Sequence, residues 1–253
     1  MENLLNRNPL EDVLFVVLLY KNENFNVRAP YDIEIMGKKM WEWVALSGAG
    51  AKIKTTPCTA ECDIISLVKP FVKDEKYTIV LYSDNPLITK SNILEIMEYF
   101  KNKGLNVLKL KRGFVFNSKH LKNCDSVLAP TNPIFDGEEF DAVDNFEMVA
   151  KVSDRLRRNI LNFHMNNGVY IADIDSTYID ADVIIEKGVR IAQNNTIKGE
   201  SYIGENTVLE PNNVVINSII SNDVVLRGAY ISNSRIAENS IVGPFESIIN
   251  RNE

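Results

Sequence analysis

The sequence predicts an α/β domain, a long linker helix and then a parallel β-helix built from short repeats. Three observations lead to this fold class. Strand and helix patterns alternate over the first half of the chain, an amphipathic helical stripe follows, and aliphatic residues recur every six positions over the last third. The chain has 253 residues, which is enough for two modest domains with packed cores.

The first part of the chain has the pattern of a mainly parallel sheet. The continuous apolar run Val13–Leu19 is typical of a strand covered on both faces, and Tyr77–Tyr82 predicts a second such strand. Further strand candidates are Asn106–Leu110 and Gly113–Phe116. Helical patterns cover Lys39–Leu46, Cys62–Val72 and a segment capped by Ser91 that runs to Lys103. Strands that alternate with helices favour an α/β architecture.

A long helix is predicted at the boundary with the repeats. The preceding segment, Leu128–Glu139, contains prolines and a glycine and is interpreted as a connector. The helix runs from Asn145 to Asn166, with Asp144 and Glu147 as a capping box. Its apolar stripe consists of Val149, Val152, Leu156, Ile160 and Phe163, and it is flanked by Arg155, Arg157 and Arg158. The pattern predicts a helix that packs on its own chain.

The last third of the chain is dominated by a six-residue period. Small and polar residues, such as Asn212–Asn213, separate the aliphatic positions and are interpreted as turn residues. A hexapeptide repeat explains this spacing if each hexapeptide forms one short strand and one turn of a β-helix. We expect the aliphatic side chains to stack inside the helix, at Ile179, Ile185, Ile191, Ile197, Ile203, Leu209, Val215, Ile220, Leu226, Ile231, Ile236, Val242 and Ile248.

Composition excludes several classes of function. The formal net charge is −6 and no basic stripe offsets it, which argues against nucleic-acid binding. No apolar run reaches the roughly 20 residues that a membrane span requires. Three sparse cysteines fit a reducing, cytoplasmic location. Cys58 and Cys62 are spaced as a weak metal pair, but without a second pair or a nearby histidine they are interpreted as ordinary thiols.

The repeats and the linker helix resemble a known enzyme family. The segments Val152–Leu161 (VSDRLRRNIL), Thr177–Asp182 (TYIDAD) and Gly243–Phe245 (GPF) are similar to those of the bifunctional N-acetylglucosamine-1-phosphate uridyltransferases/glucosamine-1-phosphate acetyltransferases. The resemblance implies a left-handed β-helix, a homotrimer and a reduced, Rossmann-like nucleotidyltransferase-like domain. The boundaries that it implies are residues 1–143 for this α/β domain, 144–168 for the linker helix and 169–253 for the β-helix.

The segment Leu81–Thr89 (LYSDNPLIT) carries the resemblance into the first domain. It is similar to the family's Leu-Tyr-Gly-Asp-x-Pro-Leu-Ile motif, whose aspartate binds the catalytic Mg²⁺. A hard dication prefers carboxylate oxygens and can bridge nucleotide phosphates, so Asp84 is the candidate metal ligand. The alternative is that Asp84 shapes a strand-end turn together with Pro86. Gly37–Met40 (GKKM) similarly resembles the family's Gly-Lys-Pro-Met segment.

The rest of the family's uridyltransferase pattern is degraded. The first strand leads into Tyr20–Arg28, which lacks the glycines that would cradle phosphates. Arg28 and Lys38 are the remaining candidates for contacting a nucleotide or nucleotide sugar. The family's second metal ligand, an asparagine, corresponds to Ser153, with Asp154 beside it as a candidate substitute. The lysine expected near Pro30 is Tyr31, and Glu61 stands where a nucleotide-contacting threonine is expected.

The acetyltransferase site has no counterpart. In the family its residues lie beyond the Gly-Pro-Phe segment, and this chain extends only to Glu253. The chain has two histidines, His120 and His164, and both precede the repeats, so the catalytic histidine is not matched. We therefore expect no acetyl transfer.

Two functions remain open at this point. The favoured hypothesis is a pseudoenzyme: a truncated, degenerate homologue of the UDP-N-acetylglucosamine pyrophosphorylase that acts as a non-catalytic oligomeric scaffold or regulatory protein. The alternative is a minimal Mg²⁺-dependent sugar-1-phosphate nucleotidyltransferase that forms a UDP-sugar. Because phosphoryl transfer depends on positioning and charge stabilisation, several independent losses favour the first hypothesis.

Overall fold

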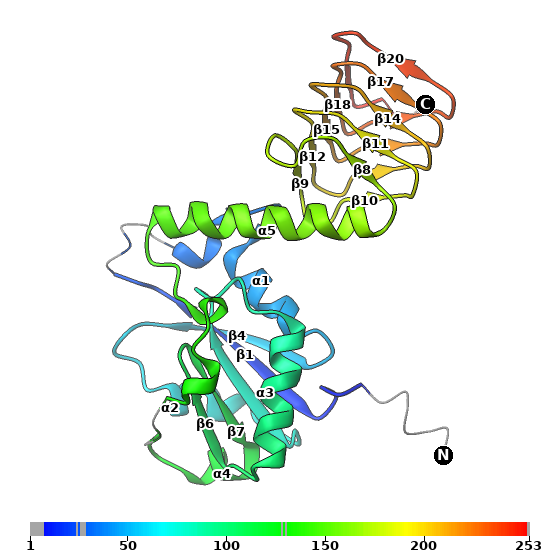
Figure 1. Cartoon of the computed structure of the whole chain (residues 1–253). Helices are drawn as coiled ribbons and strands as arrows, with labels where there is room; N and C mark the ends of the chain where they lie inside the picture. The colour runs from blue at the N-terminus through cyan, green and yellow to red at the C-terminus, as the bar shows by residue number, and fades with distance from the viewer. Residues whose placement is uncertain (1–7, 24, 26–28, 128, 130, 252–253) are drawn as a thin grey trace, which may run out of the picture. The chain divides into compact units, whose positions relative to one another are not determined.

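The computed structural model describes residues 8–251 apart from 24, 26–28, 128 and 130. The chain divides into two compact units, which are coloured along the sequence in Figure 1. The first comprises Met1–Glu34 and Lys39–Val152, and the second comprises Ile35–Lys38 and Ser153–Glu253. Within the described ranges, no helix is both long enough and apolar enough to cross a membrane.

The first unit is built on a five-stranded sheet with the order β4-β1-β5-β7-β6. Its strands are β1 (Val13–Tyr20), β4 (Lys52–Cys58), β5 (Tyr77–Tyr82), β6 (Val107–Leu110) and β7 (Gly113–Asn117). β1 pairs in parallel with β4 and β5, whereas β7 runs antiparallel to β5 and to β6. The expected parallel sheet is therefore present in β4, β1 and β5, and the β6–β7 hairpin makes the whole sheet mixed.

Helices cover both faces of this sheet. Successive side chains of β1 point to opposite faces, so they enter two separate cores. Phe15 and Val17 belong to the core that includes helices α1 and α3, and Leu14, Val16 and Leu18 to the core that includes α2 and α4. The helices are α1 (Met40–Ser47), α2 (Ile64–Val68), α3 (Lys90–Asn102) and α4 (Ser118–Asn123). Short 3₁₀ turns lie at Pro30–Asp32, Lys69–Phe71, Pro133–Phe135 and Glu138–Phe140. This two-sided burial explains why Val13–Leu19 is apolar without interruption.

Strand β4 is the one strand of the five-stranded sheet that the sequence pattern did not predict. Its residues Lys52–Cys58 are mostly exposed, and they include a proline. The strand lies at the edge of the sheet, where side chains need not be apolar. A proline is tolerated there if its backbone nitrogen lies on the unpaired side of the strand, because no hydrogen bond between strands is then lost. Apolar periodicity therefore carries no signal for it.

Three predicted helix starts were wrong in detail. Helix α3 is capped by Thr89, whose hydroxyl accepts from the Asn92 N–H, and not by Ser91. Asp63 caps α2, so the helix begins there rather than at the predicted Cys62. The long helix α5 (Phe146–Asn166) starts within one residue of the predicted Asn145, but the side chain that accepts from the Met148 N–H is that of Asn145 and not the predicted cap Asp144. Each of these helix starts contains two or more adjacent residues with polar side chains. The sequence alone does not decide which of them caps the helix.

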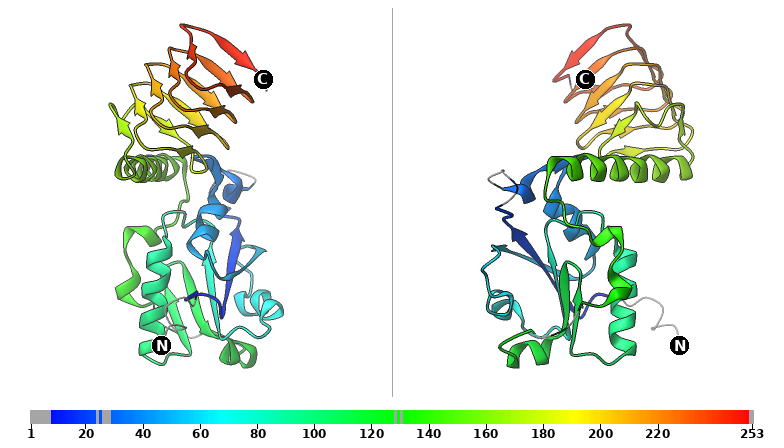
Figure 2. Two further views of the ribbon diagram at one scale, coloured as in Figure 1. Left: turned by 90° about the vertical axis from the view of Figure 1, so that its right-hand side faces the viewer. Right: turned by 60° about the vertical axis from the view of Figure 1, so that its left-hand side comes forward.

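The second unit is a left-handed parallel β-helix with three faces, seen as stacked coils in Figure 2. The first face contains β10 (Ile184–Ile185), β13 (Tyr202–Ile203), β16 (Ile219–Ile220) and β19 (Arg235–Ile236). The second contains β8 (Tyr170–Ile171), β11 (Arg190–Ile191), β14 (Val208–Leu209), β17 (Val225–Leu226) and β20 (Ile241–Val242). The third contains β9 (Tyr178–Ile179), β12 (Thr196–Lys198), β15 (Val214–Ile216), β18 (Tyr230–Ser232) and β21 (Ser247–Ile249). The hairpin β2 (Glu34–Ile35) and β3 (Lys38–Lys39) forms the remaining sheet.

The predicted repeat register is confirmed. All thirteen aliphatic positions from Ile179 to Ile248 are buried, and the most exposed of them, Ile185, is 8% exposed. They stack directly across coils, as Ile185 pairs with Ile203 and Ile203 with Ile220. The coil interior is therefore one continuous apolar column.

A second, polar ladder runs beside the apolar one. Asn195 and Asn213 are fully buried, and Nδ2 of Asn213 donates to Oδ1 of Asn195 at 2.9 Å in the coil below. Ser201, Ser218 and Ser234 form a similar chain, in which each hydroxyl accepts from the backbone N–H of the next serine. Asn213 lies in the turn between β14 and β15, as predicted, but its side chain points into the β-helix, which the sequence pattern did not indicate.

Helix α5 buries a narrower stripe than predicted. Val152, Leu156 and Leu161 are buried, whereas Phe163 is 63% exposed and does not belong to the stripe. Arg157, predicted to flank the stripe, is 5% exposed. Its guanidinium donates to the carbonyl groups of Ile174 and Thr177 at the start of the β-helix, which explains why a charged side chain is buried there.

Candidate functional site

The carboxyl edge of the sheet in the first unit gathers the predicted metal ligand and its neighbours. β1 ends at Tyr20, β4 at Cys58 and β5 at Tyr82, and Asp84 closely follows β5. The Tyr20 N–H donates to Oγ of Ser83 at 3.0 Å, so the chain after β5 is fixed against the end of β1. Binding sites of α/β sheets lie at this edge.

The β6–β7 hairpin brings a cation to the same edge. Its two-residue turn is Lys111–Arg112, between the end of β6 and the start of β7. β7 begins at Gly113, opposite Leu81, and a Cβ on this glycine would lie 2.4 Å from the Val80 carbonyl oxygen. Glycine therefore allows the close approach of β7 to β5, and the antiparallel direction of β7 places Arg112 near Asp84.

Arg112 engages both oxygens of the Asp84 carboxylate. Its Nε donates to Oδ1 of Asp84 at 3.2 Å, and its Nη2 donates to Oδ2. The side chain of Asp84 is 5% exposed and that of Arg112 is 24% exposed. This two-bond geometry is the strong, specific form of an arginine–carboxylate pair.

Two tyrosines hold the guanidinium from the sides. The Arg112 guanidinium carbon lies 4.2 Å from the ring centre of Tyr82 and 5.1 Å from that of Tyr20. The two rings meet edge to face at 5.4 Å. Both rings attract the cation, so Arg112 is fixed by its aromatic neighbours as well as by Asp84.

Burial and charge act on Asp84 in opposite directions. Burial raises the pKa of the Asp84 carboxyl, and the adjacent guanidinium of Arg112 opposes this shift. The charge of Asp144 raises the same pKa further. Arg112 is therefore the group that opposes the effect of burial on the Asp84 carboxyl.

The residues around Asp84 do not fit a Mg²⁺ ion. Mg²⁺ requires oxygen ligands in an octahedral arrangement, whereas both oxygens of Asp84 already accept hydrogen bonds from Arg112. Among the residues that the structure describes, no group of three or more histidine, cysteine, aspartate or glutamate side chains could hold a metal.

Asp154, the second predicted metal ligand, belongs to the second unit. Its Oδ1 accepts from Nη2 of Arg157 at 2.6 Å, and its Oδ2 accepts from Nε of Arg158 at 3.0 Å. These two bonds lower the pKa of Asp154. Arg158 also pairs with Asp175 at 2.8 Å, so Asp154 is part of an ionic network at the first coil of the β-helix.

The predicted substrate contacts lie elsewhere. Lys38 belongs to the second unit, where its Nζ donates to both carboxylate oxygens of Asp182 at 2.7 Å. Gly37 precedes it with a φ of +78°, and a Cβ there would lie 2.8 Å from the side chain of Asp180, so this turn requires glycine. Arg28 lies outside the described residues. The roles of Lys38, Arg28, Asp84 and Asp154 as ligands stay predictions.

Cys58 and Cys62 lie together at the same carboxyl edge. All three cysteines of the chain are free. Cys58 is buried, and burial raises its pKa to about 11. Hydrogen bonds from the hydroxyl and backbone N–H of Thr59 lower the pKa of the more accessible Cys62. The two thiols therefore differ in their expected reactivity.

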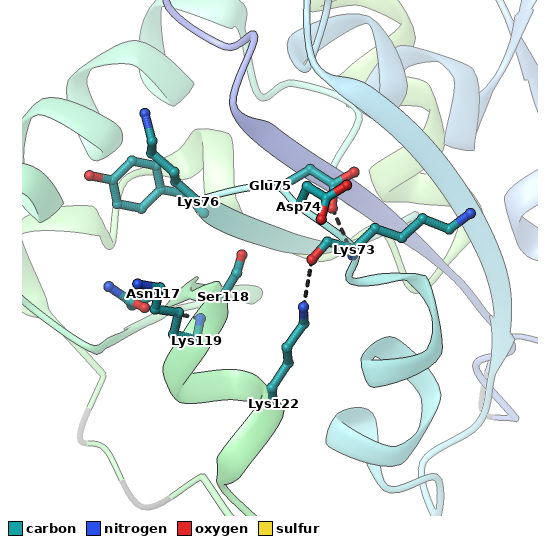
Figure 3. Close-up of a pocket in the computed structure, with 9 residues that line it drawn as sticks. Lys73, Asp74, Glu75, Lys76, Asn117, Ser118, Lys119 and Lys122 are labelled. Carbon is teal, nitrogen blue, oxygen red and sulfur yellow. Dashed lines mark hydrogen bonds between the residues drawn. The ribbon is translucent and has the colours of Figure 1, made fainter.

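A pocket at the opposite edge of the sheet is built from other residues (Figure 3). It lies where β5 begins and β7 ends, and Figure 3 shows its polar side chains. Lys122 donates to the Lys73 carbonyl oxygen at 2.5 Å, and the Lys73 N–H donates to Glu75 at 2.9 Å. Glu75 also pairs with Lys52 at 2.6 Å. The predicted site residues that the structure describes, Lys38, Asp84 and Asp154, do not line this pocket.

Several known proteins similar to this chain carry the same description. The bifunctional protein GlmU of Clostridium kluyveri is 36% identical over 111 residues, which cover 44% of this chain and 24% of the relative. GlmU of Clostridium beijerinckii is 37% identical over 111 residues, with the same coverage. GlmU of Clostridioides difficile is 24% identical over an alignment of 246 positions, covering 72% of this chain and 54% of the relative. No protein-family model matches the chain.

The matches cover only part of the relatives, so the activity of the whole GlmU protein is not transferred to this chain. This chain spans 24% of the length of the first two relatives, and the longer match has lower identity. Together with the α/β sheet and the stacked parallel coils, the matches confirm the family resemblance that the sequence motifs indicated.

Proposed function

The chain is a relative of the bifunctional GlmU proteins, and from this premise we propose that it is a non-catalytic, oligomeric protein with a nucleotidyltransferase-like domain. In this proposal it acts as a scaffold or a regulator and does not transfer a uridylyl or an acetyl group. The alternative, favoured by the Leu81–Thr89 motif, is a minimal Mg²⁺-dependent nucleotidyltransferase that forms a UDP-sugar.

The pairing of Asp84 with Arg112 carries the proposal. Phosphoryl transfer requires cations that neutralise the phosphate oxygens and hold them in place. Here the carboxylate predicted to hold that cation is bonded twice to a guanidinium, and Asp154 is bonded to Arg157 and Arg158. Neither carboxylate has a free pair of oxygens to offer, so the proposed outcome is loss of the metal-dependent chemistry.

The first experiment is an assay for pyrophosphate release. Purified protein is incubated with Mg²⁺, UTP and N-acetylglucosamine 1-phosphate, beside an authentic uridyltransferase as positive control. We expect no release above the protein-free background. The Asp84→Asn variant is the matched control: turnover by the wild type that disappears in this variant would refute the proposal and establish the enzymatic alternative.

Acetyl transfer is the second activity that we propose to be absent. The repeat region, residues 169–253, contains no histidine, so it lacks the usual side chain for general-base catalysis at neutral pH. Acetylation of glucosamine 1-phosphate from acetyl-coenzyme A, followed by thiol release, is expected to stay at background. A rate that scales with protein concentration would contradict this.

An exposed apolar column on the β-helix supports oligomer formation. On the face of β10, β13 and β16, the outward residues Ile184, Tyr202 and Ile219 are neighbours in register. Ile184 is 58% exposed and Ile219 is 40% exposed. Aligned apolar residues on a sheet face are typical of interaction surfaces, and cyclic closure prevents open-ended growth. We propose a homotrimer through the β-helix.

Sedimentation equilibrium tests the trimer. The wild type is expected to sediment as a trimer at micromolar concentration, and the double variant Ile184→Lys/Ile219→Lys is expected to sediment as a smaller species. The matched control is Ile53→Lys, an exposed apolar residue of β4 in the first unit, which should leave the trimer intact. A monomeric wild type would refute the proposal. The cytoplasmic location stays a prediction from the sequence.

A further inference from the structure

Arg112 holds its positive charge in a fixed position beside Asp84. It contributes two hydrogen bonds to one carboxylate, and its guanidinium lies against two aromatic rings. A surface arginine that merely pairs with an aspartate keeps most of its freedom and gains little. Here the carboxylate is 5% exposed, although the side chain of Arg112 is 24% exposed. Removal of the cation would therefore leave the carboxylate unpaired in a poorly solvated place.

The surroundings of Asp84 provide no second cation for it among the described residues. Lys111, the neighbour of Arg112, forms ion pairs with Asp136 at 3.2 Å and with Asp141 at 2.6 Å. Asp144 adds a further negative charge that acts on Asp84. Arg112 is thus the cation that directly balances Asp84.

One neighbouring oxygen also lacks a partner in the described part of the chain. Asn85 follows Asp84 and is 1% exposed. Its Nδ2 donates to the Asp141 carbonyl oxygen at 3.1 Å, whereas its Oδ1 is buried without a hydrogen-bond partner. Buried oxygens without partners are rare in proteins and call for an explanation. Amide and carboxylate oxygens are also the ligand types that hard divalent cations prefer.

We propose that Arg112 has taken the place of a divalent cation beside Asp84, and that removing its guanidinium uncovers a latent divalent-cation site. This inference rests on the proposed non-catalytic function, and it names the feature of this chain that closes the site. The residues involved are close in sequence. The turn Lys111–Arg112 carries the guanidinium, and Gly113 allows the β6–β7 hairpin to approach the Asp84 carboxylate.

The experiment replaces the charge while keeping the packing. Arg112→Met retains an unbranched apolar side chain between Tyr20 and Tyr82 but has no positive charge. Mn²⁺ is the probe, because free Mn²⁺ gives a strong electron paramagnetic resonance signal that binding diminishes. The full chain is titrated as wild type, Arg112→Met, Arg112→Lys and Arg112→Met/Asp84→Asn.

The expected Mn²⁺ affinities of the four proteins distinguish the loss of positive charge from a change in side-chain packing. Arg112→Met should bind one Mn²⁺ per chain at least about tenfold more tightly than wild type, equivalent to about 1.4 kcal/mol. Mn²⁺ should also raise the thermal midpoint of this variant alone. Arg112→Lys and the double variant should bind no more tightly than wild type, because one restores the cation and the other removes the carboxylate.

The contrary results are distinct from failure of the proposed function. A folded Arg112→Met protein that binds Mn²⁺ no better than wild type would overturn the latent site and leave the non-catalytic function standing. Wild-type binding that Asp84→Asn abolishes would also overturn it, because Arg112 would then not close the site. Pyrophosphate release by the wild type would instead refute the proposed function. If Arg112→Met does not fold, Arg112→Gln is titrated under the same criteria.

Discussion

The buried asparagine ladder offers the sharpest test of how the β-helix is held together. In Asn213 the side chain connects three coils: Nδ2 donates to Oδ1 of Asn195 on one side, and Oδ1 accepts from the Ala229 N–H at 2.8 Å on the other. Nδ2 also lies near the carbonyl oxygens of Glu210 and Leu226. Replacing Asn213 with alanine removes all of these bonds while preserving the backbone.

The cost of this replacement follows from what each former partner retains. The Glu210 and Leu226 carbonyls keep other donors, the Asn195 side chain and the Glu210 N–H respectively. The Ala229 N–H loses its acceptor and stays buried, which costs about 1–3 kcal/mol. The lost donation from Nδ2 adds about 1 kcal/mol. We therefore expect Asn213→Ala to destabilise the β-helix by about 2–4 kcal/mol, or on the order of ten degrees in thermal midpoint.

The neighbouring residue provides the matched control. Asn212 belongs to the same turn but lies nearer the surface, and it has a φ of +69°. Asn212→Gly keeps that left-handed conformation accessible, so its midpoint should stay within about two degrees of wild type. Thermal unfolding followed by far-ultraviolet circular dichroism measures both variants. Equal midpoints for Asn213→Ala and Asn212→Gly would show that the buried ladder contributes nothing to the stability of the β-helix.

Three further predictions concern stability and reactivity. Ile203→Asp places a carboxylate in the fully buried column and should cost several kcal/mol, whereas Ile184→Asp, on the outer face, should cost far less; similar melting curves would contradict the register. Burial lowers the pKa of His164 below its ordinary 6.5, so the unfolded chain binds that proton more readily and stability should fall as the pH drops below 6.5. His164→Gln should flatten the pH dependence of the thermal midpoint, and an unchanged slope in this variant would oppose the prediction. Cys62 should react with iodoacetamide faster than Cys58 because its pKa is lowered, and Thr59→Val should slow it; faster labelling of Cys58, read by peptide mass spectrometry, would reverse the assignment.

The repeat unit was predictable because its signal is periodic. Each inward position faces the same environment, so aliphatic residues recur at every coil and the register can be read from spacing alone. The inward direction of Asn213 was not predictable in this way, because a polar residue inside a β-helix has the same local pattern as a turn residue. That direction is decided by bonds to Asn195 and Ala229 in neighbouring coils, which no short window of sequence contains.

The first unit was predictable where both faces of a strand are buried. β1 and β5 carry continuous apolar runs, whereas the edge strand β4 has no such run. Arg112 gave no local signal, because Lys111–Arg112 has the pattern of a solvated turn. The spacing nevertheless held a clue: two residues separate the predicted strands Asn106–Leu110 and Gly113–Phe116, which indicates a hairpin, and a turn of that hairpin must lie at one edge of the sheet.

Both carboxylates that were predicted to bind metal are paired with arginine side chains. Asp84 is bonded to Arg112 in the first unit, and Asp154 is bonded to Arg157 and Arg158 in the second. Only the Asp84 carboxylate is buried, whereas the side chain of Asp154 is 51% exposed. Loss of the partner of a buried charge is strongly destabilising, because it leaves that charge uncompensated. Once such a pair is established, each partner constrains the other. A variant chain that gained metal binding at Asp84 would have to lose the arginine and supply further ligands, and an intermediate with an unpaired buried charge is expected to be less stable than the wild type. In the proposed arrangement, the cost of that intermediate is the physical barrier that keeps the guanidinium paired with Asp84.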